Sequence, residues 1–414
     1  MTDLPDIQGL CPPRFAAVKD AFAANFTDAP EGLNEQGARF SVCIDGEVVI
    51  DLMGGWADAA RTVAYGPETL TPVFSTGKAV MATLIATCVE RGLLDYDAPV
   101  SRYWPAFGQN GKEAITVAQM MSHQSGLPGF SEAVDPTIWF DRPAVLDQLC
   151  AQAPMWPPGT ASGYHPITIG YLAGELFRIV DGRTMGTALR QDFPGLDLWI
   201  GLPEAEHGRV AQMRKPASAP DLGVIDAVKR AAFLDKGSAP GGRGSTEWRT
   251  MEIPSANMHA TAADLARFMS VLTTGALDGR TVLSPDTLNQ MRRERIAGLD
   301  RVVPFDVSWA AGVMRNERLN IFGPKPETLG HCGWGGSCAL ADPGARVSAA
   351  YVMTRQSPHL LGDPRATRLI EALTLPADGC GPRRDRPAGR APGRRQPCAA
   401  TGRLRWRRRR PRPR

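Results

Sequence analysis

Several features are rare or missing in this 414-residue chain, and each absence excludes a class of protein. The eight cysteines form no C-x-x-C pair and have no histidine at zinc-site spacing, so we expect reduced thiols and no metal. The first residues are acidic where a secretory signal needs basic ones, and no apolar stretch follows them. The longest apolar stretch, residues 79–89, falls well short of the roughly 20 residues of a membrane helix. We therefore expect a cytoplasmic protein without a membrane span.

Charge is distributed unevenly along the chain. The net charge is +4, but residues 376–414 hold 14 arginines against two acids and account for +12, which leaves −8 on residues 1–375. The net negative charge of residues 1–375 does not favour binding of a polyanion such as a nucleic acid. The Arg/Pro/Gly-rich tail has almost no apolar periodicity and is predicted to be disordered. Nucleic-acid binding by the tail is an alternative, but we expect no nucleic-acid partner because the tail lacks interleaved aromatic residues.

Hydrophobic periodicity predicts strands near both ends of residues 1–375 and helices between them. Residues 38–44 and 48–53 alternate around an Asp-Gly pair typical of a hairpin turn, and further strands are predicted at 308–314, 337–341 and 346–354. Helices are predicted after Ser75, at 144–150, 170–180 and 365–373, and after Thr261 and Ser284. Residues 96–254 show many breaks and few convincing strands. No internal repeat is evident.

A nucleophile motif stands at the head of the predicted helix after Ser75. Ser75-Thr76-Gly77-Lys78 is an S-x-x-K sequence, and one helical turn would place the serine and lysine side chains on the same face. A neutral lysine amine there could accept the hydroxyl proton, provided that burial or a cationic neighbour lowers its pKa. Taken alone, the motif is equally compatible with a helix-capping serine and a solvated lysine.

Two later segments strengthen this interpretation. Tyr164 follows Pro158-Gly159-Thr160, where a phenol could relay a proton to or from Ser75, although a core tyrosine would give the same pattern. The Gly-rich segment 330–336 contains His331, Gly333 and Trp334, and an edge strand of this kind would let a substrate approach the backbone. A Gly-rich loop with a hydrogen-bonded histidine is the alternative.

Together these motifs, with residues 121–127 between the first two, resemble the β-lactamase, penicillin-binding protein and esterase superfamily over roughly residues 15–375. The resemblance implies an α/β (α+β) fold of the β-lactamase/transpeptidase type, in which helices flank an antiparallel sheet. Residues 1–95 and 255–375 would form the sheet region, 96–254 an inserted, mainly helical region of the same domain, and 376–414 the tail.

The resemblance also implies a role for each residue of the site. Ser75 would be the nucleophile, and Lys78 and Tyr164 the proton-transfer pair. The backbone N–H groups of Ser75 and Trp334 would form an oxyanion hole. His331, Gly333 and Trp334 would contact the substrate, and no cofactor is implied.

Departures from the family pattern favour an esterase. His331 stands where lactamases have a lysine, and Pro166 where they have an asparagine, so the anchor for a substrate carboxylate is weakened. An uncharged ester needs only the nucleophile, the proton relay and the oxyanion hole. No G-x-S-x-G elbow occurs in the chain, which argues against an α/β-hydrolase. The sequence therefore predicts a class C β-lactamase-like serine carboxylesterase acting on small-molecule esters with short to medium acyl chains.

Other activities stay open on the same fold: β-lactamase, amidase, acyltransferase, or a catalytically silent binding protein. The natural substrate, the stereochemistry and the oligomeric state are not determined by the sequence. His123, His207, His259 and His359 have no metal-ligand spacing and are expected to be surface or hydrogen-bonded histidines. Trp139 and Trp156 could line an acyl pocket or belong to the core.

Overall fold

A computed structural model describes residues 6–374, which lie within a single compact unit. Fourteen strands occur among these residues: β1 Gln8–Leu10, β2 Gly37–Ile44, β3 Glu47–Gly55, β4 Thr71–Pro72, β5 Leu198–Trp199, β6 His259–Ala260, β7 Ala276–Leu277, β8 Arg280–Thr281, β9 Ile296–Leu299, β10 Asp306–Trp309, β11 Met314–Arg315, β12 Leu329–Cys332, β13 Cys338–Asp342 and β14 Val347–Met353.

Twelve α-helices accompany them within the described range: α1 Ala16–Thr27, α2 Lys78–Glu90, α3 Val117–Met121, α4 Arg142–Ala151, α5 Thr168–Asp181, α6 Met185–Asp192, α7 Ala227–Lys229, α8 Thr246–Thr250, α9 Ala262–Met269, α10 Val271–Thr274, α11 Pro285–Arg292 and α12 Pro364–Thr374. No helix in this part of the chain is both long enough and apolar enough to cross a membrane.

Nine strands form one antiparallel sheet in the order β1-β3-β2-β14-β13-β12-β11-β10-β9. Its centre joins the two ends of the described chain, because β2 pairs with β14 from Ala38↔Met353 to Ile44↔Val347. The β2–β3 hairpin turns at Asp45 and Gly46, both of which have positive φ, as an Asp-Gly turn requires. The mixed α/β fold with an antiparallel sheet, predicted from the sequence, is confirmed.

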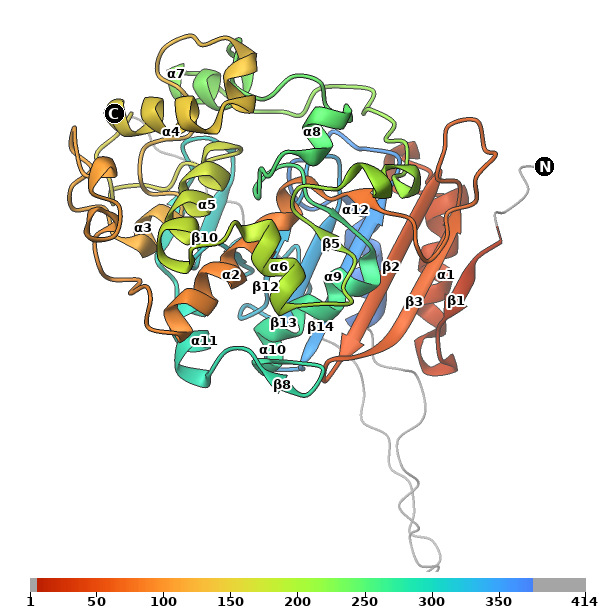
Figure 1. The fold of residues 1–414 in the computed structure, drawn as a ribbon. Helices are drawn as coiled ribbons and strands as arrows, with labels where there is room; N and C mark the ends of the chain where they lie inside the picture. Colours follow the sequence, from red (N-terminus) through yellow and green to blue (C-terminus); the bar gives the residue numbers. More distant parts are fainter. Residues whose placement is uncertain (1–5, 375–414) are drawn as a thin grey trace, which may run out of the picture. The chain divides into compact units, whose positions relative to one another are not determined.

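Helices cover both faces of this sheet (Figure 1). On one face, α9 packs against β14 and β2, and side chains such as Val352 point toward it. On the other face, α1 and α12 pack together over side chains such as Tyr351. Successive residues of β14 are therefore buried on opposite faces, so the central strands contribute to two hydrophobic cores.

Helix starts match the sequence predictions closely. Thr261 caps α9 by accepting a hydrogen bond from the Asp264 N–H, and Ser284 caps α11 with Pro285 in its first turn. The predicted helices at 144–150, 170–180 and 365–373 lie within α4, α5 and α12. Residues 96–254 contain six of the α-helices and, within the described chain, only the two-residue strand β5.

The single strand predicted at 308–314 is wrong. β10 and β11 form a hairpin there, closed by a hydrogen bond from the Ala310 N–H to the Val313 carbonyl. Gly312 has a φ of 92°, and a Cβ at this residue would lie 2.6 Å from Cβ of Ala82 in α2. The close approach of α2 therefore selects a tight turn that hydrophobic periodicity does not reveal. The predicted tail, residues 376–414, lies outside the described residues.

A buried arginine ties the end of the described chain to its beginning. The fully buried Arg365 side chain makes two hydrogen bonds to Asp363, at 3.0 and 2.8 Å, and lies 3.1 Å from the Glu35 carboxylate. The Asp363 carboxylate in turn lies against Gly336, where a Cβ would come within 2.1 Å of it. This cluster therefore supports the turn that follows β12.

We predict that Arg365→Met lowers the free energy of unfolding by about 3–5 kcal/mol, because the buried Asp363 carboxylate loses its cation and the buried Glu35 loses its charged neighbour. Urea denaturation monitored by circular dichroism measures the change. Arg318→Met is the control, since Arg318 is exposed and lies 3.8 Å from Asp306, an arrangement worth less than about 1 kcal/mol. Equal destabilisation by the two substitutions would contradict the assignment of Arg365.

Candidate active site

Ser75 lies in a short 3-10 helix, Phe74–Gly77, that leads directly into α2. Phe74 has a φ of 49°, the left-handed region that bulky residues rarely adopt. This backbone conformation turns the chain sharply between β4 and the helix, and Ser75 reaches the cavity from there. Ser75 accepts no capping hydrogen bond, so the capping-serine alternative is not supported.

Lys78 lies one turn later and is completely buried. Its Nζ is 2.9 Å from Ser75 Oγ, 2.8 Å from the Pro166 carbonyl oxygen and 2.8 Å from the Ser255 carbonyl oxygen. Burial lowers the pKa of Lys78 well below its ordinary value, and no carboxylate opposes this effect. A neutral amine can donate to both carbonyls and keep its lone pair for the Ser75 hydroxyl.

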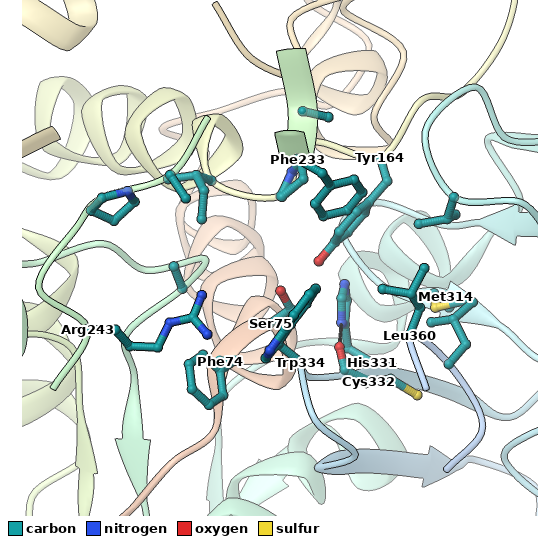
Figure 2. Close-up of a pocket in the computed structure, with 18 of the residues that line it drawn as sticks. Phe74, Ser75, Tyr164, Phe233, Arg243, Met314, His331, Cys332, Trp334 and Leu360 are labelled. Atoms are coloured by element: carbon teal, nitrogen blue, oxygen red, sulfur yellow. Dashed lines mark hydrogen bonds between the residues drawn. The ribbon is translucent and has the colours of Figure 1, made fainter. Parts of the chain in front are cut away.

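Tyr164 completes this group of side chains. Its hydroxyl points toward Ser75 (Figure 2), and Lys78 Nζ lies 4.9 Å from the centre of its ring. The ring stacks on Trp309 at 5.9 Å and meets His123 edge-on at 5.0 Å. Burial raises the pKa of Tyr164, so the group is a neutral phenol at physiological pH.

Asp300, which sequence reasoning missed, fixes the backbone of the tyrosine segment. Its Oδ1 accepts the Tyr164 N–H at 2.8 Å, and its Oδ2 accepts the Ser162 hydroxyl at 2.8 Å. The N–H groups of Val302 and Val303 also donate to Oδ1. Nothing local in the sequence marks an aspartate 136 positions away as the partner of Tyr164.

Residues 121–127 hold the same segment from the other side. The His165 ring donates from Nδ1 to the Gly163 carbonyl, and its Nε2 accepts the Leu127 N–H at 3.1 Å. Ser125 Oγ lies 2.8 Å from the same Nε2. The Gly163 N–H donates to the His123 carbonyl at 2.9 Å. The segment is therefore positioned by neutral, buried hydrogen bonds.

His331 lies near the end of β12 beside the tyrosine, with its ring 5.9 Å from that of Tyr164. Burial lowers the pKa of His331 to about 3, so the imidazole is neutral. Its Nδ1 lies 2.8 Å from the Cys332 carbonyl, which can only accept, so Nδ1 carries the hydrogen. The other nitrogen, Nε2, is buried, has no partner in the described chain and presents a lone pair.

β12 is an inner strand only in part. β11 pairs with Leu329 and Gly330, and the strand then continues past β11 as His331 and Cys332, which line the cavity. The sequence predicted that the Gly-rich segment is an edge strand. In the structure, only its residues after Gly330 are free of a neighbouring β11 residue on that side.

Gly333 and Trp334 follow this strand and have different places. Gly333 does not line the cavity; a Cβ at this residue would lie 2.3 Å from the Val73 carbonyl oxygen, so the glycine permits close packing on the serine turn. The Trp334 side chain does line the cavity. Neither the Ser75 N–H nor the Trp334 N–H donates to an acceptor within residues 6–374, which leaves both for a substrate oxygen.

The cavity around Ser75 has a volume of about 150 Å³ and is mostly apolar. Aromatic and aliphatic side chains that the sequence did not single out form much of its wall: Phe233, Trp248, Val303, Trp309, Met314, Leu360 and Leu361. Arg243, which the sequence analysis also missed, is the one lysine, arginine, aspartate or glutamate among the residues that line the cavity, and it is exposed (Figure 2). Trp139 and Trp156 lie in the core and donate their indole N–H groups to the Gly237 and Ala161 carbonyls.

The expectation for the remaining histidines is partly wrong. His207 and His359 lie near hydrogen-bonding oxygens, as expected. His123 is buried behind Tyr164, where its Nδ1 accepts the His165 N–H at 3.2 Å. His259 is buried against the Trp248 ring, and neither of its ring nitrogens is hydrogen bonded within the described chain. Burial lowers the pKa of His259 to about 3, so its ring is neutral. Among the described residues no cluster of His, Cys, Asp or Glu could hold a metal ion.

Known proteins resemble this chain in sequence and in fold. The sequence model of the family described as Beta-lactamase matches residues 22–374. Esterase/beta-lactamase LipL of Mycobacterium tuberculosis (strain ATCC 25618 / H37Rv) is 35% identical over 84% of this chain and 82% of its own. A penicillin-binding protein homologue from Caulobacter crescentus has a TM-score of 0.86 and 55% identity, over 89% of this chain and 99% of its own. A family VIII carboxylesterase has a TM-score of 0.82 and 36% identity, over 89% and 98%.

The fold and the relatives of this chain are those of serine hydrolases. The chain belongs to the beta-lactamase family.

Proposed function

We propose that this enzyme is a carboxylesterase that cleaves esters with short to medium acyl chains through an acyl-enzyme on Ser75. The observation that carries the proposal is the neutral, carboxylate-free environment of Lys78, whose Nζ lies 2.9 Å from Ser75 Oγ. The names of two relatives, an esterase/beta-lactamase and a family VIII carboxylesterase, support it.

Acylation follows from these positions. Lys78 takes the Ser75 proton as Oγ attacks the ester carbonyl, and the Ser75 and Trp334 N–H groups stabilise the oxyanion. Collapse of the tetrahedral intermediate breaks the bond to the alcohol oxygen, which receives a proton through Tyr164. Water then attacks the acyl-enzyme, with Lys78 as base, and releases the carboxylic acid and free Ser75.

The cavity supports the choice of acyl chain. Its volume of about 150 Å³ is similar to that of apolar protein cavities that hold benzene, so it suits an acyl group of a few carbons. The neutral His331 gives no cation for a substrate carboxylate, and its Nε2 lone pair would repel one. These features favour a neutral acyl group over a carboxylated β-lactam.

The cytoplasmic location of the protein stays a prediction from the sequence.

We predict that Ser75→Ala reduces hydrolysis of p-nitrophenyl butyrate to below a few per cent of wild type. The melting temperature should change little, because the Ser75 side chain caps no helix. Fluorophosphonate labelling, located by mass spectrometry, should also be lost, whereas Ser101→Ala keeps both signals. Substantial residual activity in the pure variant, or labelling of another residue, would remove Ser75 from the proposed role.

The pH dependence tests Lys78. Because its pKa is lowered, the amine becomes neutral at a lower pH than an ordinary lysine, so kcat/KM should reach its plateau well below pH 10 and fall at lower pH as Lys78 is protonated. Lys78→Arg should lose about 10²-fold or more, since a guanidinium stays protonated. A rate that keeps rising about ten-fold per pH unit up to about pH 10 would mean that Lys78 titrates at its ordinary pKa.

The choice of esterase over β-lactamase can be tested at His331. We predict that ester turnover exceeds nitrocefin turnover by orders of magnitude, and that His331→Lys shifts the ratio toward nitrocefin by about 10-fold, or about 1.4 kcal/mol. His359→Lys is the control, because His359 lies beside Glu31 and does not line the cavity. Comparable wild-type efficiencies, or a ratio unchanged in His331→Lys, would show that residue 331 does not set the substrate class.

A further inference from the structure

A second, larger hollow adjoins the catalytic cavity. We call it the cationic groove; its volume is about 840 Å³, and it is lined mainly by residues 210–213, 215–219, 240–244, 248–249, Trp334 and Gln356. Phe74, Arg243 and Trp334 line both the groove and the catalytic cavity. The groove therefore begins where the proposed acyl cavity ends, beside Ser75.

The charges of the groove are all of one sign. Lys215, Arg243 and Arg249 line it, and no aspartate or glutamate does. None of these three cations has a carboxylate within 4.0 Å in residues 6–374, although many other arginines on the body are paired. Since residues 1–375 carry a net charge of −8, an acid-free group of three cations is a local departure from the rest of the surface.

Arg243 has the key place within this group. Its guanidinium carbon lies 5.3 Å from the centre of the Phe74 ring and 5.8 Å from that of the Trp334 ring. The aromatic faces hold the cation without using its hydrogen-bond donors, so the donors are available to an anion. Figure 2 shows the guanidinium directed into the space in front of Ser75.

Arg249 adds a second cation without a partner. Its Nε is buried and makes no hydrogen bond within the described chain. Burial also lowers the pKa of Arg249. A bound anion would restore the interactions that this guanidinium lacks.

We propose that the cationic groove binds an anionic group, such as a carboxylate, on the alcohol half of the ester, and that Arg243 is the specificity-determining residue for this group. The inference rests on the proposed esterase function. The acyl half is assigned to the apolar cavity because a carboxylate there would face the neutral His331. The alcohol half then extends past Arg243 toward Lys215 and Arg249.

The test compares 4-carboxyphenyl butyrate with 4-carbamoylphenyl butyrate, which differ in charge but form the same butyryl-enzyme. Deacylation is therefore identical, and kcat/KM reports acylation alone. We expect Arg243→Gln to lower kcat/KM for the carboxylate about 10-fold more than for the amide, mainly through KM. Arg243→Lys should restore most of the loss, because it keeps the charge.

Arg102→Gln is the matched control. Arg102 is an exposed arginine 5.7 Å from the Tyr103 ring and lines neither hollow, so this variant should leave the ratio unchanged. A loss in Arg243→Gln that is equal for both esters would overturn the proposal, since it would mean a structural role only. Mono-p-nitrophenyl succinate, with its carboxylate on the acyl side, should show no dependence on Arg243; the same dependence there would overturn the assignment to the alcohol half.

Binding separates this proposal from the esterase assignment. Calorimetric titration of Ser75→Ala with 4-carboxyphenyl butyrate needs no turnover, and adding Arg243→Gln should weaken the Kd by about 10-fold. If wild type cleaves neither ester but this difference is found, the proposed function fails and the groove assignment stands. If the esters are cleaved and binding does not depend on Arg243, the function stands and the groove assignment fails.

Discussion

The burial of Lys78 without an opposing carboxylate is the constraint on which the rest of the site depends. Removing an ammonium from water is costly unless the amine becomes neutral, and a neutral amine must still satisfy its donors. The Pro166 and Ser255 carbonyls meet that need. Three segments far apart in sequence, the start of α2, the tyrosine segment and the chain before β6, must therefore meet around one nitrogen atom.

Because Lys78 needs only a backbone carbonyl from the tyrosine segment, the lysine site tolerates a proline at residue 166, where the family pattern has an asparagine. Pro166 replaces an asparagine side chain, but its backbone oxygen accepts the hydrogen bond from Lys78. The tyrosine segment is rigid because His165 and Asp300 hold its backbone from two sides. The position of Tyr164 is thus supported by groups that do not contact Ser75.

The neutrality of the cavity and the charge of the adjoining groove have a common physical basis. Around Ser75, burial keeps Lys78 and His331 uncharged, so an apolar acyl group loses little on entering. Beyond Phe74 and Trp334, arginine side chains without carboxylate partners face the wider groove. The boundary between the two environments coincides with Arg243, which lines both. The two hollows can therefore distinguish the halves of one substrate by charge.

The sequence by itself determined features set by neighbouring residues. The Asp-Gly hairpin, the Thr261 and Ser284 caps and the one-turn spacing of Ser75 and Lys78 follow from local backbone geometry. The motif order also indicated the family and the fold. Two-residue strands such as β4 and β11 could not be predicted, because sheet pairing and not hydrophobic alternation produces them.

Only the tertiary structure decided the electrostatics and the walls of the site. Asp300 reaches Tyr164 across 136 positions, and Arg243 comes from a Gly-rich loop that looks like an ordinary turn in sequence. The turn at Gly312 exists because α2 leaves no room for a Cβ. The charge states of Lys78 and His331 depend on burial, which is a property of the whole packed chain. A sequence motif specifies which groups are present, whereas their solvation and their partners from distant segments are fixed only when the chain has folded.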